Sequence, residues 1–252
     1  MTSPALEIRN LQKSFGALRV ARDINLSLER GARHALIGPN GAGKTTLVNL
    51  ITGVLKPSSG IVLLDGEDVT AQSQAKRSRR GIARTFQINQ LFRGLTVLEN
   101  LYLAVGERTR ACNRLWRPAG TERAVVEEAV THLDALRLTD EALKPVRELP
   151  YGRQRLVEIA IALAQRPKVL LLDEPAAGVP SSESHLILDV IGGLDPDIAV
   201  LIIEHDMDVV FRFAERITVL VAGAVLTEGP PQQIAADETV RAVYLGTKIE
   251  RG

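Results

Sequence analysis

Short apolar runs alternate with segments of helical periodicity along most of the chain. Runs of Val, Ile and Leu bounded by charge, glycine or proline are typical of buried strands, whereas apolar residues three and four apart indicate helices. Because strands and helices alternate, we expect an α/β fold with a mainly parallel sheet covered on both faces. The pattern predicts strands over residues 6–9, 24–28, 33–38, 60–65, 168–173 and 199–204, and two more in 216–226 divided at Gly223. It predicts helices over residues 44–52, 122–136, 156–165, 183–191 and 208–214.

The stretch over residues 96–144 departs from this alternation. Strand signals fade and helical periodicity dominates, so we expect a helical insertion within the α/β domain. The apolar runs are all short, whereas a membrane-spanning helix needs roughly 18 or more apolar residues in succession. The first five residues contain neither a basic segment nor the start of an apolar one, and we therefore expect no secretory signal.

Composition narrows the classes of function. The 252 residues include 31 Lys and Arg against 30 Asp and Glu, and this net charge of +1 argues against a protein that coats nucleic acid through bulk charge. Hydrophobic residues make up 45% and charged residues 24%, which excludes disordered and collagen-like chains. The single cysteine, Cys112, excludes an internal disulfide and a cysteine-rich zinc site, and it fits a reducing compartment.

A glycine-rich turn follows the strand predicted over residues 33–38. Residues 38–45 read Gly-Pro-Asn-Gly-Ala-Gly-Lys-Thr, a phosphate-loop pattern in its usual place between a strand and a helix. The glycines let backbone N–H groups approach an anion closely, and the helix N-terminus favours negative charge. Lys44 supplies positive charge for the β- and γ-phosphates, and the Thr45 hydroxyl suits Mg²⁺. We therefore expect ATP and Mg²⁺ here, with nucleotide contacts from Gly38, Pro39, Asn40, Gly41, Ala42, Gly43, Lys44, Thr45 and Thr46.

Two adjacent carboxylates follow the apolar strand over residues 168–173. Because the carboxyl ends of parallel strands meet at the ligand crevice, we expect Asp173 and Glu174 beside the phosphate loop. Neighbouring residues on a strand point to opposite sides, so the two groups can take different tasks. We expect Asp173 to bind Mg²⁺ and Glu174 to act as general base on the attacking water. Taken alone, Asp-Glu-Pro is equally typical of a strand exit turn.

Together these segments resemble the ATP-binding subunits of ABC transporters, over about residues 6–246. The resemblance implies a P-loop NTPase core with a mainly parallel sheet, an antiparallel β subdomain and an inserted helical subdomain. It also implies that Phe15 stacks on adenine, that Gln87 senses Mg²⁺ and the attacking water, and that His205 contacts the γ-phosphate. Catalytic roles therefore fall on Glu174, His205, Gln87 and Lys44, and metal binding on Thr45, Gln87 and Asp173.

The segment over residues 149–155 stands where the family signature belongs and departs from Leu-Ser-Gly-Gly-Gln. Pro150 replaces the serine and offers neither a hydroxyl nor an amide hydrogen. Gly152 is kept, and the resemblance implies that Pro150, Tyr151 and Gly152 meet the nucleotide of a partner subunit. Residues 177–180 also lack the aspartate usual in the family. Both departures bear on the geometry of the site between the two subunits of an ATPase dimer. Two consequences are open: hydrolysis is slower, or a partner ATPase supplies the better half-site.

A finer resemblance is to the ATPases of branched-chain amino acid importers, in residues 80–87, 91–101, 149–155, 176–178 and 243–246. It implies one ABC ATPase domain over residues 1–252, with a core of 1–87 and 168–252 and a helical part over 88–167. The implied partners are a second ATPase subunit, identical or different, two membrane permease subunits and, indirectly, a periplasmic solute-binding protein. The implied place is the cytoplasmic face of the inner membrane. Urea or amide uptake and lipopolysaccharide export are related alternatives.

Two other classes compete with this interpretation. A P-loop kinase has a similar phosphate loop but does not need Gln87, the signature segment and His205 in that order. A non-transport ABC protein acting on DNA or ribosomes usually carries coiled coils, tandem ATPase domains or a zinc module, so no nucleic acid partner is expected. The basic cluster over residues 76–80 is expected to be a solvated face or a contact with headgroups or permease. The arginine-rich residues 107–120 are expected to form a surface loop or a permease-facing element.

Overall fold

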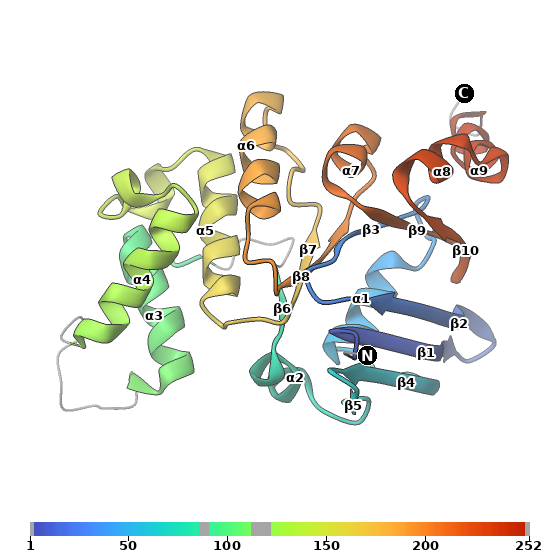
Figure 1. The fold of residues 1–252 in the computed structure, drawn as a ribbon, viewed down its shortest axis with the longest axis horizontal. Helices are drawn as coiled ribbons and strands as arrows, with labels where there is room; N and C mark the ends of the chain where they lie inside the picture. The colour runs from blue at the N-terminus through green and yellow to red at the C-terminus, as the bar shows by residue number, and fades with distance from the viewer. Residues whose placement is uncertain (1–2, 86–90, 112–121, 250–252) are drawn as a thin grey trace.

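Two β-sheets form the frame of the protein, whose computed structural model describes residues 3–85, 91–111 and 122–249 (Figure 1). The larger sheet has six strands in the order β10-β9-β3-β8-β7-β6. Its neighbouring strands are parallel except β10, which pairs with β9 in antiparallel orientation. The predicted mainly parallel sheet is therefore confirmed. The strands are β3 (Arg33–Ile37), β6 (Ile82–Arg84), β7 (Val169–Asp173), β8 (Ala199–Ile203), β9 (Arg216–Val221) and β10 (Ala224–Gly229).

Strands β3, β7 and β8 are buried along their whole length. A parallel strand covered on both faces needs apolar side chains on both, which explains why these segments lack alternation. The register pairs Ile203 of β8 with Leu36 of β3 and with Asp173 of β7. The residues that follow these three strands therefore emerge at one edge of the sheet, where ligands of α/β folds bind.

The smaller sheet is antiparallel, with the order β2-β1-β4-β5. Its strands are β1 (Leu6–Phe15), β2 (Leu18–Leu28), β4 (Ser59–Leu64) and β5 (Glu67–Asp68). The first two strands are longer than the alternation predicts. Register shifts interrupt their pairing between Ile8 and Leu11 and again around Lys13. A bulge changes which face a side chain occupies, so the alternation stops although the strand continues.

Helices α3, α4 and α5 lie together on one side of the molecule (Figure 1). Helices α3 and α4 fall within the stretch over residues 96–144 where helices were predicted. Their residues Leu101, Ala129 and Leu156 belong to the same buried cluster as Leu170 and Ile202 of the sheet. Because one core runs through both parts, the boundaries of a separate helical subdomain stay a prediction. No helix in the described part of the chain is long and apolar enough to span a membrane. The helices are α1 (Lys44–Thr52), α2 (Gln74–Arg80), α3 (Val97–Thr109), α4 (Arg123–Ala135), α5 (Tyr151–Leu163), α6 (Ser181–Gly192), α7 (Met207–Phe213), α8 (Pro231–Ala236) and α9 (Glu238–Ile249).

Three helical features differ from the sequence prediction. Helix α5 begins at Tyr151, earlier than residue 156, because Pro150 takes the N-cap position and polar residues of the first turns, such as Gln154, are buried. Helices α8 and α9 were not predicted, and neither was α2, which consists mostly of arginine and other polar residues. The prediction that the basic cluster over residues 76–80 is a solvated face is wrong for Arg77. Its side chain is only 1% exposed and donates hydrogen bonds to backbone oxygens.

Candidate nucleotide-binding site

The phosphate loop connects β3 to α1 at the carboxyl edge of the larger sheet. Gly43 takes the N-cap position of α1 in a left-handed conformation, with φ 101°, which glycine adopts without strain. A Cβ atom on Gly38 would lie 2.1 Å from the backbone oxygen of Leu220 in β9, so only glycine fits there. The loop borders an open pocket of about 350 Å³. The pocket is lined by Asn40, Gly41, Ala42, Gly43, Lys44, Thr45, Thr46, Asp173, Glu174 and Ile203.

Lys44 places its ammonium group at the loop. Its Nζ donates to the carbonyl oxygens of Gly38 at 2.6 Å and Pro39 at 3.0 Å. Burial lowers the pKa of Lys44, and the nearby carboxylates of Glu174 and Asp173 oppose that shift. A partly desolvated cation beside loop amides and a helix N-terminus is suited to bind phosphate groups.

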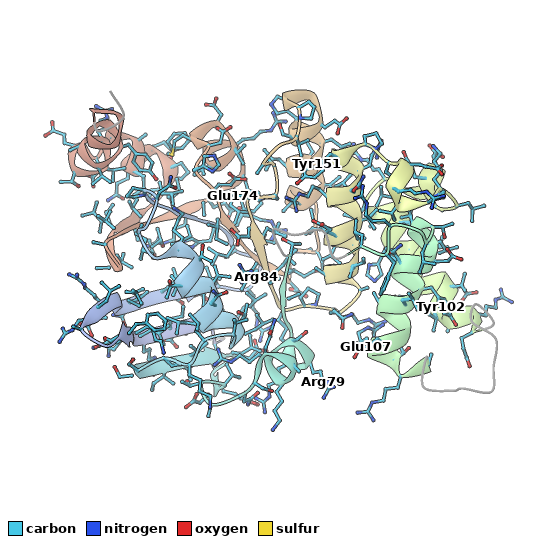
Figure 2. All side chains as sticks on the ribbon, turned by 180° about the vertical axis from the view of Figure 1, so that it is seen from behind. Arg79, Arg84, Tyr102, Glu107, Tyr151 and Glu174 are labelled. Atoms are coloured by element: carbon cyan, nitrogen blue, oxygen red, sulfur yellow. The ribbon has the colours of Figure 1, made fainter. Side chains whose placement is uncertain are left out.

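Asp173 ends β7 with a side chain that is only 3% exposed. Its Oδ2 accepts a hydrogen bond from Nη2 of Arg84, in β6, at 2.7 Å. Nη1 of Arg84, which is labelled in Figure 2, donates at 2.7 Å to Oδ1 of Asn49 in α1. Sequence analysis missed Arg84 and Asn49 as site residues. No local pattern marks them, because strand order alone brings β6 beside β7.

Glu174, labelled in Figure 2, follows the last residue of β7 and has a left-handed backbone conformation with φ 47°. The different directions of Asp173 and Glu174 thus come from this turn rather than from strand alternation. Oε1 of Glu174 lies 3.3 Å from Nδ1 of His205, whose side chain is 62% exposed. The structure therefore brings together the carboxylate and the imidazole that the sequence singled out, from the ends of β7 and β8.

Glu204 is a buried carboxylate next to His205 in the chain, and it was not predicted as a site residue. It is 2% exposed, and its carboxylate accepts from the backbone N–H groups of Ala176 at 3.5 Å and His205 at 3.3 Å. Burial raises the pKa of Glu204, and these two hydrogen bonds oppose the rise. The sequence feature that could have identified Glu204 is its position as a charged residue directly after the apolar run of β8. The carboxyl group ties the loop after Glu174 to the end of β8.

The donor set of the pocket fits Mg²⁺ bound together with nucleotide. Thr45 and Asp173 line the same pocket and offer one hydroxyl and one carboxylate. Among the described residues no group of three or more His, Cys, Asp and Glu side chains could hold a metal ion by itself. This arrangement suits Mg²⁺, which keeps several waters and binds through one or two carboxylates plus substrate phosphates.

Other predicted site residues lie away from this pocket. Pro150 is the N-cap residue of α5, and Tyr151, labelled in Figure 2, lies in the first turn and is 39% exposed. The centre of the Tyr151 ring is 5.1 Å from Cζ of Arg155. A Cβ on Gly152 would lie 2.2 Å from the Glu183 carboxylate, so the helix N-terminus packs closely against α6. Residues 150–152 are absent from the pocket lining.

Two predicted site residues remain, Phe15 and Gln87. Phe15 ends β1 with half of its surface exposed and Lys13 Nζ 4.9 Å from its ring centre, and it does not line the pocket. Exposure leaves its ring free to stack on a base, and its adenine contact stays a prediction. Gln87 lies outside the described residues.

Comparison with known proteins agrees with this geometry. The ABC transporter family matches residues 21–177, which contain the phosphate loop, the signature segment and both carboxylates. The chain belongs to the ABC transporter ATPases. A second family, described as branched-chain amino acid ATP-binding cassette transporter, matches residues 224–249 of this ABC ATPase.

Relatives match this ABC ATPase over nearly its whole length. It is 38% identical to the high-affinity branched-chain amino acid transport ATP-binding protein BraF of Pseudomonas aeruginosa, over 98% of this chain and 99% of that protein. It is 37% identical to LivG of Escherichia coli, a protein of the same description, with the same coverage. Among solved structures, the ADP conformation of the ATP-binding cassette MJ1267 has a TM-score of 0.86 at 34% identity, covering 97% of this chain and 100% of that one.

A dimeric ATP-binding cassette extends the comparison to the working assembly. MJ0796, bound to ADP and phosphate in a post-hydrolysis state, has a TM-score of 0.73 at 26% identity, covering 90% of this chain and 98% of that one. The protein is thus an ABC ATPase that binds nucleotide and hydrolyses ATP coupled to transport. ATPases of this family dimerise and work in complexes with membrane subunits.

Proposed function

We propose that this ABC ATPase is the motor subunit of an importer for branched-chain or other hydrophobic amino acids. The observation that carries the proposal is the match of its last strand and helices, residues 224–249, to the branched-chain amino acid cassette family. Relatives named for branched-chain amino acid transport, which match over 98% of the chain, support it further. The sequence alternatives, urea or amide uptake and lipopolysaccharide export, are addressed by the uptake experiment described below.

The proposed chemistry assigns one task to each group of the pocket. The loop amides and Lys44 bind the phosphates, and Thr45 and Asp173 hold Mg²⁺, which neutralises charge on the transferred phosphoryl group. Glu174 accepts a proton from the attacking water. Its 3.3 Å contact with His205 supports a shared role, because the imidazole can orient the carboxylate. Gln87 is proposed to sense the metal and water.

A second ATPase subunit is proposed to complete the site. The N-terminus of α5, with Pro150, Tyr151 and Gly152, lies outside the pocket of its own chain. Presented by a partner, its helix dipole and the Gly152 N–H would face the γ-phosphate. Closure of the dimer would exclude water and strengthen the charge interactions, and hydrolysis would let the two subunits separate.

The permease subunits are proposed to dock beside β6. A pocket of about 220 Å³ there is lined mostly by apolar atoms, with Leu91 and Ile161 among its residues. Glu158 of α5 also lines it, and burial raises the pKa of this carboxyl group. Its Oε1 is buried and has no hydrogen-bond partner among the described residues. These features favour a short apolar permease segment that carries a hydrogen-bond donor, at the cytoplasmic face of the inner membrane.

Glu174→Gln tests the hydrolytic assignment. The amide cannot take up a proton, so we expect ATP turnover by the reconstituted transporter to fall about 100-fold or more, with ATP affinity within a few-fold of wild type. Loss of hydrolysis should also stabilise the closed dimer, measured by light scattering in the presence of ATP. The exposed Glu215→Gln is the matched control and should leave turnover unchanged. Normal turnover in Glu174→Gln would remove Glu174 as the base.

Purification of the complex in mild detergent tests the transport assignment. Two permeases and a second ATPase should co-purify, and vesicles containing the complex and its binding protein should accumulate leucine, isoleucine or valine only with ATP. Uptake of urea or short amides instead would replace the proposed solute while leaving the ATPase assignment intact. Co-purification with lipopolysaccharide-export components would replace import itself.

A further inference from the structure

Arg84 connects the two elements that carry the candidate metal ligands. Its side chain is 10% exposed, and its two terminal nitrogens bind different partners. One nitrogen donates to Oδ2 of Asp173 at the end of β7, and the other to Oδ1 of Asn49 in α1, both at 2.7 Å. A planar guanidinium holds two acceptors in a fixed relative position, unlike the freely rotating ammonium of a lysine.

Asn49 lies on the same helix face as Thr45. The two residues are four positions apart in α1, so their side chains follow one another on one side of the helix. Asp173 and Thr45 line the same pocket. The spacing between the Thr45 hydroxyl and the Asp173 carboxylate therefore depends on how α1 and the end of β7 are held together, and Arg84 is bonded to both.

The hydrogen bond from Arg84 uses one of the two oxygens of the Asp173 carboxylate. Arg84 binds Oδ2 of Asp173, and a carboxylate has a second oxygen that can accept another ligand. Outer hydrogen bonds of this kind orient metal-binding side chains, and their removal usually weakens metal affinity 10- to 100-fold. The bond also compensates a carboxylate that is otherwise shielded from water.

We propose that Arg84 is a positioning residue for the metal site, where it fixes the distance between Asp173 and the face of α1 that carries Thr45. The inference rests on the proposed Mg²⁺ site at these two residues. A role limited to neutralising the buried Asp173 charge would affect stability alone. The positioning role makes a separate demand, because the affinity for the metal must then depend on the shape of the guanidinium and on its second anchor, Asn49.

The test measures metal affinity rather than turnover. The full-length protein is titrated with a non-hydrolysable ATP analogue in EDTA and at a series of Mg²⁺ concentrations. Arg84→Lys keeps the charge but loses the fork, and should raise the half-saturating Mg²⁺ concentration about tenfold, with the analogue's Kd in EDTA unchanged. Asn49→Ala removes only the helix anchor and should raise it by a smaller factor. Arg108→Lys changes a comparable ion pair with Glu128 in the helical part and should leave both values unchanged.

The outcomes separate this inference from the function on which it rests. If wild-type protein binds the analogue equally well with and without Mg²⁺, the metal site itself is wrong. If Mg²⁺ strengthens binding equally in wild type and Arg84→Lys, the metal site stands and the positioning role is overturned. An unchanged Mg²⁺ requirement in Asn49→Ala would overturn the link to α1. Neither variant removes a charge from the pocket, and thermal melting verifies that each is folded before titration.

Discussion

Arg77 offers a sharp test of how the phosphate-binding helix is held. The guanidinium donates to the carbonyl oxygens of Leu50 and Ile51 at 2.7 Å each, to that of Thr70 at 2.7 Å, and to that of Gln72 at 3.2 Å. Leu50 and Ile51 lie in the last turn of α1, where carbonyls have no partner within the helix. Arg77 thus caps the end of the helix that begins at the phosphate loop.

The perturbation is Arg77→Met, which keeps an unbranched apolar side chain and removes the guanidinium with its charge and donors. Hydrogen bonds to a charged group contribute about 1.5–3 kcal/mol each, and burial of the guanidinium itself costs several kcal/mol, so the gross sum is partly offset. We expect the free energy of unfolding to fall by about 3–5 kcal/mol, in the range for broken buried networks. Urea denaturation followed by circular dichroism measures the change.

The neighbouring Arg79 provides the matched control, because it lies on the same helix and is exposed (Figure 2). Arg79→Met should change the free energy of unfolding by less than about 0.5 kcal/mol. If the free energy of unfolding fell equally in the two variants, the capping argument would be refuted. Arg77 would then contribute no more to stability than an exposed arginine of the same helix. Arg77→Lys should fall between them, because one ammonium cannot reach all four carbonyls.

Three further predictions concern the loop and a buried histidine. Lys44→Ala should weaken ATP binding at least about tenfold in calorimetry, because a charge-assisted contact to phosphate is lost. Gly38→Ala forces a Cβ to 2.1 Å from a backbone oxygen and should lower the urea midpoint well below that of Gly94→Ala, whose Cβ would meet nothing within 4 Å. Burial lowers the pKa of His34 from 6.5 to about 4. Below pH 6.5 this histidine is therefore protonated in the unfolded chain, whereas in the folded protein it stays neutral until about pH 4. Stability should therefore fall by about 3 kcal/mol as the pH drops through that window, and His34→Gln should flatten this pH dependence. Unaltered ATP affinity, equal midpoints or an unchanged slope would contradict the respective argument.

The parts of the site that sequence could predict are local. The phosphate loop is eight consecutive residues whose glycines have a steric reason, seen at Gly38 and Gly43. Asp173 was found because it ends an apolar run, and such runs are strands whose carboxyl ends meet at one edge of the sheet. His205 was found through the family resemblance, supported by its place two residues beyond the apolar run of β8. Helix α1 was predicted with its bounds because its apolar spacing, the loop before it and Gly53 after it all agree.

Contacts between distant segments were beyond sequence reasoning. Arg77 and Arg79 are the same residue type two positions apart, yet one is buried and the other exposed, because only Arg77 faces the end of α1. Arg84 and Asp173 are 89 positions apart and meet only because β6 pairs with β7. The prediction of β1 stopped at residue 9 although the strand continues to Phe15, because bulges break the alternation on which the prediction depended.

The sequence by itself determined the family, the phosphate loop and the order of its catalytic candidates, because these depend on short runs of residues whose backbone requirements are local. Only the tertiary structure decided which charges are buried and which atoms they contact, because strand order and helix packing fix distances between residues that the chain keeps far apart. A buried guanidinium or carboxylate is tolerated only where the fold supplies its hydrogen-bond partners. The periodicity of apolar residues along the chain does not predict which residues those partners are.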